Sequence, residues 1–191
     1  MQEIKFVSPE LVETFFKKIK SIRDRGLFAA MYFYGLRSAE VGLLQIEDID
    51  FDNNRIFIRA LKNGITGQHL LNAQVKKYIK VYLEQERLHK RTLEKALFLS
   101  QKGGSLTSTQ VYRLFRMYAK KAKFPEDKRH CHVFRHSLAV HLAESGSSLY
   151  EVKEHLRHKN VTNTAIYFAL TNQTRIEKQR QAFESPMLAK I

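Results

Sequence analysis

The chain has 191 residues, of which 43% are hydrophobic, so it can bury a sizeable core, and this excludes a wholly disordered protein. Its 33 Lys and Arg against 19 Asp and Glu give a formal charge of +14, which indicates a polyanionic partner, with nucleic acid as the leading class. The single cysteine, Cys131, excludes an internal disulfide and a zinc site built from several cysteines, and it favours a reducing, cytoplasmic location.

A membrane surface is the other partner that would suit this charge. The sequence has neither an amphipathic lysine-rich helix with a free apolar face nor a lipidation signal. It also lacks a run of about 18 apolar residues and a signal-peptide pattern. We therefore expect no membrane partner, no membrane span and no export.

The first part of the chain is predicted to be helical. A helix begins at Ser8-Pro9-Glu10, where a capping side chain, a first-turn proline and an acid precede helical apolar spacing. A second helix is predicted over residues 26–34, ending near Gly35. Ser38 then opens a short third helix, which places Arg37 at its start.

Strand patterns follow these helices. Residues 46–51 and 55–60 alternate around an asparagine-rich turn and predict two strands. Asn63-Gly64 is a second hairpin signal, and a third strand is predicted near residues 68–71. We therefore expect a small antiparallel three-stranded sheet.

The remaining sequence returns to helical spacing. Helices are predicted over residues 73–88 and 108–122, and residues 130–167 indicate several helices with breaks at Gly146 and His158. The expected fold class is therefore α+β and mostly helical.

The domain organisation is expected to be simple, because no repeat, low-complexity segment or obvious linker divides the chain. Residues 1–171 are expected to form one domain. Residues 172–191 are expected to form a C-terminal tail with helical character.

Two basic residues occupy positions where they could bind an anion. Arg37 lies at a helix start, where its guanidinium and nearby backbone N–H groups can face one anion. Lys62 lies at the end of an apolar strand, just before the Asn63-Gly64 turn, so a hairpin tip carries its ammonium group. Taken alone, each is better explained as a solvated surface side chain.

The segment His132-Val133-Phe134-Arg135-His136 is more informative. Positions three apart share a helix face, so His132 and Arg135 lie together while Val133 and Phe134 can turn inward. Such an imidazole and guanidinium pair can hold one phosphate. A polar helix face, with His136 capping or packing locally, explains the segment equally well.

The last candidates are two histidines and a tyrosine. His155 and His158 are three residues apart, but no cysteine or acidic third ligand accompanies them, so no metal site is predicted. His155 is interpreted as an exposed helical residue. Tyr167, one of eight tyrosines, would by itself be assigned to packing.

The order and spacing of these residues distinguish them as a set. They are Arg37 in G-L-R-x-x-E, Lys62 on a hairpin, His132-x-x-Arg135, His158 and, nine positions later, Tyr167. This set resembles the ordered signature of the tyrosine site-specific recombinases of the phage integrase family, over roughly residues 8–170. Five motifs together arise by chance far less often than any one of them. A shared function therefore explains the set better than five separate structural explanations do.

The resemblance implies the fold of a tyrosine-recombinase catalytic domain and an enzyme that cleaves and rejoins DNA. In such an enzyme Arg37 and Arg135 bind the non-bridging oxygens of a phosphodiester through charge-assisted hydrogen bonds. His132 and His158 add donors to the same phosphate, and His132 is the expected proton-transfer residue.

The resemblance also implies covalent catalysis. Tyr167 would attack the phosphate and form a 3′-phosphotyrosyl bond, while Lys62 protonates the departing 5′-hydroxyl. No metal, nucleotide or other cofactor is implied. Glu40 is expected to orient Arg37 or support the helix start rather than to transfer a proton.

Two features depart from the pattern that the resemblance implies. Members of that family usually carry glycine before the second histidine, whereas this chain has Arg157, at a cost of roughly 1 kcal/mol if a left-handed turn persists there. They also commonly have an additional N-terminal helical domain. A fragment and a naturally short protein, as in some fimbrial-type invertases, both fit this sequence.

The resemblance further implies partners. Double-stranded DNA is the expected substrate, bound mostly through phosphate contacts and with strong salt dependence. A homotetramer is expected on paired DNA sites, and a monomer or weak oligomer without DNA, in a protein encoded by a bacterium, phage or mobile element. The tail could dock on a neighbouring protomer or pack on its own domain.

Two other functions remain open at this point. A type IB topoisomerase uses similar residues but reseals the strand that it cut, whereas a recombinase exchanges strands between two sites. A DNA-binding regulator on a recombinase scaffold would also be basic. The intact set of five motifs, with Tyr167 present, favours the recombinase.

Overall fold

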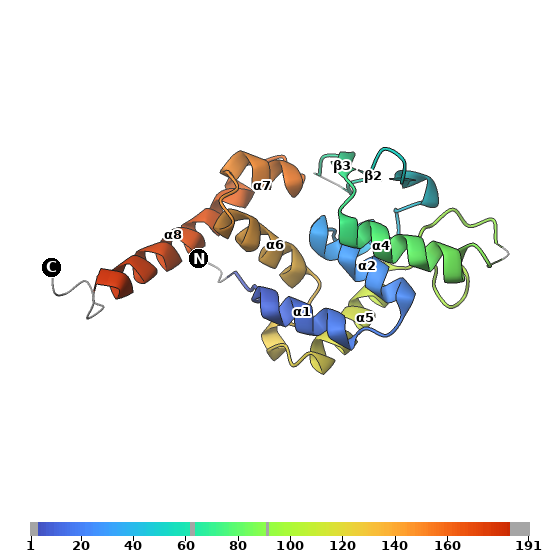
Figure 1. Ribbon diagram of the computed structural model, residues 1–191, viewed down its shortest axis with the longest axis horizontal. Helices are drawn as coiled ribbons and strands as arrows, with labels where there is room; N and C mark the ends of the chain where they lie inside the picture. The colour runs from blue at the N-terminus through green and yellow to red at the C-terminus, as the bar shows by residue number, and fades with distance from the viewer. Residues whose placement is uncertain (1–3, 62–63, 91, 184–191) are drawn as a thin grey trace.

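The structure is a computed structural model that describes residues 4–61, 64–90 and 92–183. Within these residues the chain is mostly helical, with a small sheet at one end (Figure 1). The α-helices are α1 (Pro9–Lys18), α2 (Ile22–Phe33), α3 (Ser38–Val41), α4 (Ala73–Tyr82), α5 (Ser108–Lys121), α6 (His132–Glu144), α7 (Leu149–His155) and α8 (Thr162–Phe183). The strands are β1 (Ile49–Asp50), β2 (Arg55–Ile58) and β3 (Gly67–Leu70). Single turns of other helix types are η1 (Ile46–Asp48), η2 (Leu83–Arg87) and η3 (Glu126–Lys128).

The helices begin at the capping residues that the sequence contains. Ser8 accepts a hydrogen bond from the Leu11 N–H, which starts α1 as predicted. The second helix was predicted to start at Gly26, but it begins four residues earlier, because the Ser21 hydroxyl caps the Asp24 N–H at 3.2 Å. The predicted short third helix is confirmed as α3.

The sheet is antiparallel with strand order β1-β2-β3, which confirms the three-stranded prediction. Its first strand is shorter than predicted. Residues 46–48 form a turn of 3-10 helix instead of a strand, because the Asp48 carboxylate accepts a hydrogen bond from the Gln45 N–H at 2.8 Å. Arg59 pairs with the same carboxylate and holds this turn against β2.

The buried apolar residues fall into two clusters. The large cluster joins α1 to α5, the sheet and the start of α6, and its centre is the aromatic group Phe15, Phe28, Phe115, Phe124 and Phe134. The small cluster lies between α6, α7 and α8 and consists of Leu138, Ala139, Val140, Val152, Leu156 and Tyr167. Helix α6 therefore contributes to both.

Helix α8 is the longest element and carries Tyr167 in its second turn. Its C-terminal half projects away from the other helices (Figure 1). The predicted helical character of the tail is confirmed up to Phe183, and α8 runs without a break through residue 171, where a domain boundary was expected. Residues 184–191 lie outside the described residues.

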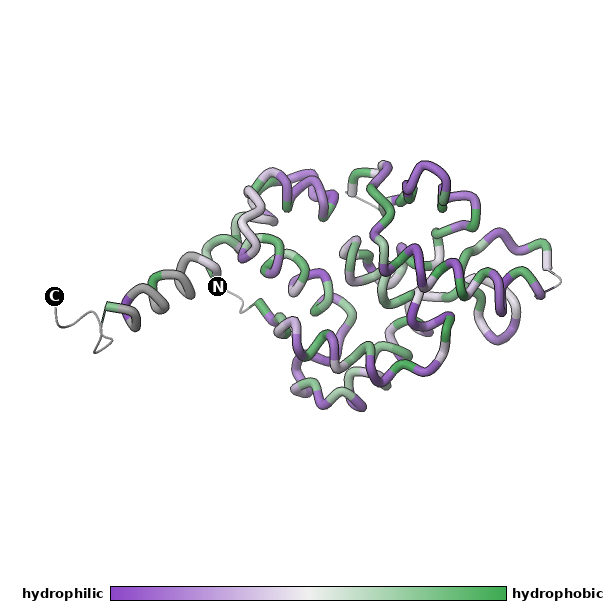
Figure 2. The backbone as a smooth tube through the Cα atoms, viewed as in Figure 1, coloured by the Kyte–Doolittle hydropathy of each residue, from purple (hydrophilic) through white to green (hydrophobic). Residues whose placement is uncertain are grey.

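Hydrophobic and hydrophilic residues alternate along the helices rather than gathering in one long apolar stretch (Figure 2). In the part of the chain that the structure describes, no helix is both long and apolar enough to cross a membrane.

Candidate active site

Arg37 lies at the N-cap of α3, where Glu40 fixes it from one turn further on. The Arg37 backbone N–H donates to Glu40 Oε2 at 2.9 Å, and its Nη1 donates to Oε1 at 2.8 Å. The Arg37 side chain is 31% exposed while that of Glu40 is fully buried. The structure thus supports the predicted orienting role of Glu40 and leaves part of the Arg37 guanidinium open to an anion.

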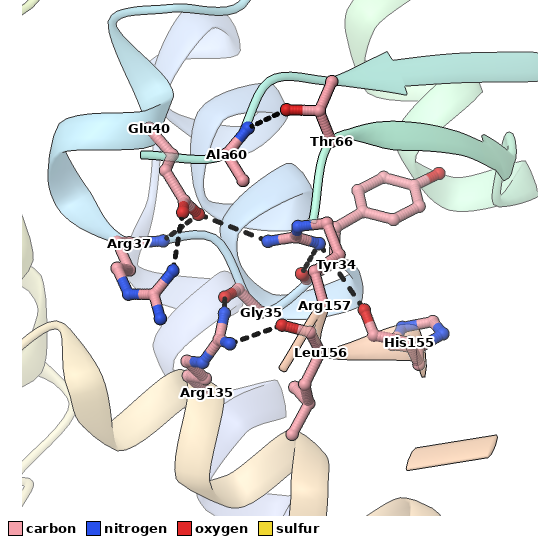
Figure 3. Close-up of polar contacts among 10 residues, drawn as sticks. All are labelled: Tyr34, Gly35, Arg37, Glu40, Ala60, Thr66, Arg135, His155, Leu156 and Arg157. Atoms are coloured by element: carbon pink, nitrogen blue, oxygen red, sulfur yellow. Dashed lines mark hydrogen bonds and ion pairs between the residues drawn. The ribbon is translucent and has the colours of Figure 1, made fainter. Parts of the chain in front are cut away.

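Arg135 comes from the first turn of α6 and is almost completely buried, with 4% of its surface exposed. Its Nη1 donates to the Gly35 carbonyl at 2.5 Å and its Nη2 to the Leu156 carbonyl (Figure 3). Gly35 has φ +55°, and a Cβ there would lie 2.8 Å from the Leu156 side chain, so this close approach requires glycine. Burial lowers the pKa of Arg135 to about 10, and the guanidinium still remains charged at neutral pH.

Arg157 brings a third guanidinium to the same place. Its Nη1 donates to the Tyr34 carbonyl at 2.8 Å, and its Nη2 lies 3.2 Å from Glu40 Oε2, so one carboxylate holds two arginines (Figure 3). The left-handed turn that the sequence suggested is present, with φ +57° at Arg157. The glycine expected here is therefore replaced by a buried cation at a backbone cost of roughly 1 kcal/mol.

The two predicted histidines differ in exposure, since His158 is buried and His132 is exposed at the start of α6. His158 follows Arg157 and hydrogen-bonds through Nδ1 to Thr164 Oγ1 at 2.9 Å. Burial and the charge of Arg135 lower the pKa of His158 to about 4. The pKa of His132, whose residue is exposed overall, is lowered by partial desolvation of its ring and then by the charge of Arg135. Both imidazoles are therefore neutral at pH 7, and each offers one N–H donor.

Tyr167 reaches the same region from α8, with only 3% of its surface exposed. Burial raises the pKa of its phenol, and the charge of Arg135 acts in the opposite direction. Its hydroxyl lies 2.8 Å from Nδ1 of His136, the residue after Arg135. Sequence reasoning assigned His136 only to capping or local packing, because no spacing rule connects positions 136 and 167.

Lys62 lies outside the described residues, so its predicted place in the site stays a prediction. The residues around it do approach the site. The Ala60 N–H donates to Thr66 Oγ1 at 3.0 Å, and the Ile65 N–H donates to the Arg157 carbonyl at 3.2 Å. Gly64 forms a β-bridge with His158.

His155 was interpreted as an exposed helical residue, and this is wrong. It is half-buried, and its Nε2 lies 2.7 Å from the Phe33 carbonyl, where the end of α7 meets the end of α2. Among the residues that the structure describes, no group of three or more His, Cys, Asp or Glu side chains could hold a metal ion.

The described residues therefore combine fixed cations, neutral imidazoles and a buried phenol. Such a site suits a tetrahedral anion, because guanidiniums donate hydrogen bonds in the planar geometry that phosphate oxygens accept. It also holds a potential nucleophile, since the charge of Arg135 favours negative charge on the phenol oxygen, although burial outweighs it and keeps the pKa of Tyr167 raised.

Comparison with known proteins gives one consistent result. A sequence model of the phage integrase family matches residues 5–174. The tyrosine recombinase XerD of Staphylococcus epidermidis is 32% identical over 78% of this chain and 51% of XerD. The type 1 fimbriae regulatory protein FimE of Escherichia coli is 32% identical over 77% of this chain and 74% of FimE. The chain spans about half the length of XerD.

Solved structures agree with these sequence relatives. The crystal structure of XerA recombinase aligns with a TM-score of 0.83 over 97% of this chain and 67% of XerA, at 22% identity, which shows a shared fold. The XerH site-specific recombinase, in a post-cleavage complex with its palindromic difH substrate, aligns with a TM-score of 0.82. That alignment covers 96% of this chain and 54% of XerH, at 26% identity.

Proposed function

The chain belongs to the phage integrase family, and we propose from this that it is the catalytic part of a site-specific DNA recombinase that cleaves and rejoins strands through a 3′-phosphotyrosine intermediate. One observation supports this most directly. Tyr167 is buried on α8 within the electrostatic influence of Arg135, and Arg135 is itself fixed by two backbone carbonyls. A nucleophile and a phosphate-binding cation are thus held in one site.

The proposed reaction begins with phosphate binding by Arg37 and Arg135, with His132 and His158 as further donors. The Tyr167 oxygen then attacks phosphorus, and the bond between phosphorus and the 5′-oxygen breaks. The tyrosine proton leaves to the imidazole of His132 or to solvent, and the departing 5′-oxygen takes its proton from Lys62.

The covalent intermediate keeps the energy of the broken phosphodiester bond. A 5′-hydroxyl from a partner strand can therefore attack the phosphotyrosine, release Tyr167 and restore a phosphodiester in the new combination. The step is a pair of transesterifications, so atoms and charge balance without a cofactor.

We propose that double-stranded DNA is the substrate, that four protomers assemble on paired sites, and that the free protein is a monomer or weak oligomer. The net charge of +14 supports the DNA partner. Exposed Ile176 and Phe183 on the projecting half of α8 support docking of this tail on a neighbouring protomer. A cytoplasmic location is proposed from the single, unpaired Cys131.

The test is cleavage of a nicked suicide DNA, whose short 5′-hydroxyl fragment is lost after cutting and cannot be rejoined. The binding site is first selected from random duplexes or from sequences that flank the gene. We expect a covalent protein–DNA band on a denaturing gel with the wild-type chain and none with Tyr167→Phe. Absence of the band on a duplex that the chain demonstrably binds would contradict the proposal and favour a DNA-binding regulator.

A matched control separates the phosphate clamp from general charge loss. Arg135→Lys keeps the charge but loses the fork that reaches both carbonyls, so we expect cleavage to fall while DNA affinity changes little. Exchange of strands between two sites, rather than relaxation of supercoils alone, distinguishes a recombinase from a topoisomerase.

A further inference from the structure

We propose that His136 is a positioning residue for the nucleophile: its Nδ1 accepts the hydrogen bond of the Tyr167 hydroxyl and fixes the phenol oxygen beside the arginine clamp. This inference rests on the proposed function, because it assigns a partner to the residue that attacks DNA. It adds a residue to the site that the motif pattern leaves unassigned.

The contact is short and enclosed. Nδ1 of His136 and the Tyr167 oxygen are 2.8 Å apart, and the two rings lie with centroids 5.8 Å apart at 47°. Tyr167 is only 3% exposed. Water therefore cannot readily take the place of His136 as the hydrogen-bond partner of the phenol. A buried hydroxyl without a partner is destabilising, so the acceptor determines where the oxygen sits.

The two rings lie on two helices, α6 and α8, that pack against each other. His136 follows Arg135 on α6, and the first turn of that helix is anchored in the large core by Phe134. Tyr167 belongs to the small cluster on α8. The hydrogen bond therefore fixes the nucleophile relative to the helix that carries Arg135.

His136 acts as an acceptor here and not as a base. Burial, followed by the charges of His132, His130 and Arg135, lowers the pKa of His136 to about 4. The pKa of Tyr167 is raised above its ordinary value of 10.0. Both shifts make proton transfer from the phenol to this imidazole unfavourable. The ring stays neutral and holds the hydroxyl until the phosphate arrives.

Positioning of this kind affects the rate of attack rather than the binding of DNA. An attacking atom held near its target reacts as if it were at very high concentration, and a shift of about 1 Å removes much of that advantage. Since His136 is half-buried and its Nδ1 contacts the Tyr167 hydroxyl, it has no part in gripping the duplex in this proposal.

The experiment compares His136→Asn with His136→Gln on the nicked suicide DNA described above. Both variants are polar and neutral, but only the Asn side chain places a polar atom where Nδ1 lies. We expect His136→Gln to form the covalent complex about tenfold more slowly, the size of one lost hydrogen bond, and His136→Asn to stay within about threefold of wild type. DNA affinity, measured by gel shift, is expected to stay within about twofold for both.

The outcomes separate this inference from the function on which it rests. If the wild-type chain forms no covalent complex on bound DNA, the proposed function fails. If the wild-type chain cleaves and His136→Gln cleaves equally fast or faster, only the positioning role is overturned. Equal losses in Asn and Gln also overturn it, because they indicate a packing requirement. Thermal unfolding of both variants confirms that the folded protein is compared.

Discussion

The two hydrophobic clusters differ in size and in what they hold. The large one contains a group of mutually packed phenylalanines and supports the helices from which the clamp is built. The small one has six buried residues, none larger than leucine except Tyr167, the proposed nucleophile. Opening free energies in a protein vary with local packing, so we expect the part that carries the proposed nucleophile to open at lower cost than the part that carries the proposed phosphate-binding arginines.

The boundary between the two clusters runs through α6. Phe134 belongs to the large cluster and Leu138 to the small one, and Arg135 and His136 lie between them. The Arg135 guanidinium is thus placed where the large cluster ends. Under the proposed function, a rigid phosphate-binding group would lie next to a more adjustable tyrosine that bonds to DNA and leaves it again.

Truncation of Phe134 breaks the large cluster and has the largest expected effect. Its ring lies 4.8 Å from that of Phe15 and 5.0 Å from that of Phe115. Phe134→Ala is expected to lower the free energy of unfolding by about 4 kcal/mol, because it removes a fully buried ring and leaves a cavity. Urea unfolding measures this, and a loss below about 1 kcal/mol would show that the site is not the tightly packed centre.

Glu40 connects the helices of the large cluster with the segment before α8. Its carboxylate pairs with Arg37 at the start of α3 and with Arg157, which precedes α8. Glu40→Gln removes the only carboxylate that faces both guanidiniums among the described contacts, and we expect a loss of about 3 kcal/mol.

The Glu40 effect has a defined pH dependence. Burial works to raise the pKa of this carboxyl, but the Arg37 hydrogen bonds and the Arg157 charge outweigh it and lower the pKa below 4.5. A lowered folded-state pKa stabilises the protein above the unfolded value and ceases to do so as pH falls through the folded value. The difference between wild type and Glu40→Gln should therefore be full at pH 7 and shrink below about pH 4.5. A difference that grows on acidification would contradict this assignment.

Val152 tests the small cluster directly. It is fully buried on α7, so Val152→Ala is expected to cost about 2 kcal/mol from lost burial and a small cavity. Hydrogen exchange should show the added opening in α7 and α8 and leave α2 and α5 unchanged. Tyr150→Ala, at an exposed position of the same helix, is the matched control with an expected change under about 0.5 kcal/mol. Uniform loss of protection across all helices would mean that the two clusters open together.

Position 157 has the smallest expected effect and isolates one backbone angle. Arg157→Gly and Arg157→Ala both remove the pair with Glu40, but only glycine adopts φ +57° without strain. We expect the glycine variant to be more stable than the alanine variant by about 1 kcal/mol in urea unfolding. The opposite order would show that the turn relaxes when arginine is removed.

Much of the architecture follows from local sequence signals. Capping residues such as Ser8 and Thr107 start helices where expected, and the breaks at Gly146 and His158 separate α6, α7 and α8. The mostly helical fold and the three-stranded sheet are therefore predictable. Arg37 at a helix start was also predictable, because the Arg37 and Glu40 spacing places the carboxylate one turn from the cap.

The errors arise where a long-range contact decides the outcome. Ile46 to Asp48 alternate like a strand, but Arg59 and a capping hydrogen bond to Asp48 select a turn. The half-buried position of His155 depends on a carbonyl of α2 far away in sequence. The contact of His136 with Tyr167 spans 31 positions, and neither the residue types nor their spacing predicts it.

The continuity of α8 has a mechanical consequence. Tyr167 and Phe183 lie on one unbroken helix, so the projecting end stands roughly 24 Å from the nucleophile at about 1.5 Å per residue. A helix of this length behaves as a stiff rod, and its inner end rests on α6 and α7 as on a fulcrum (Figure 1). If α8 stays rigid, a sideways displacement at Phe183 would produce a much smaller displacement at Tyr167, as a lever does at its short arm.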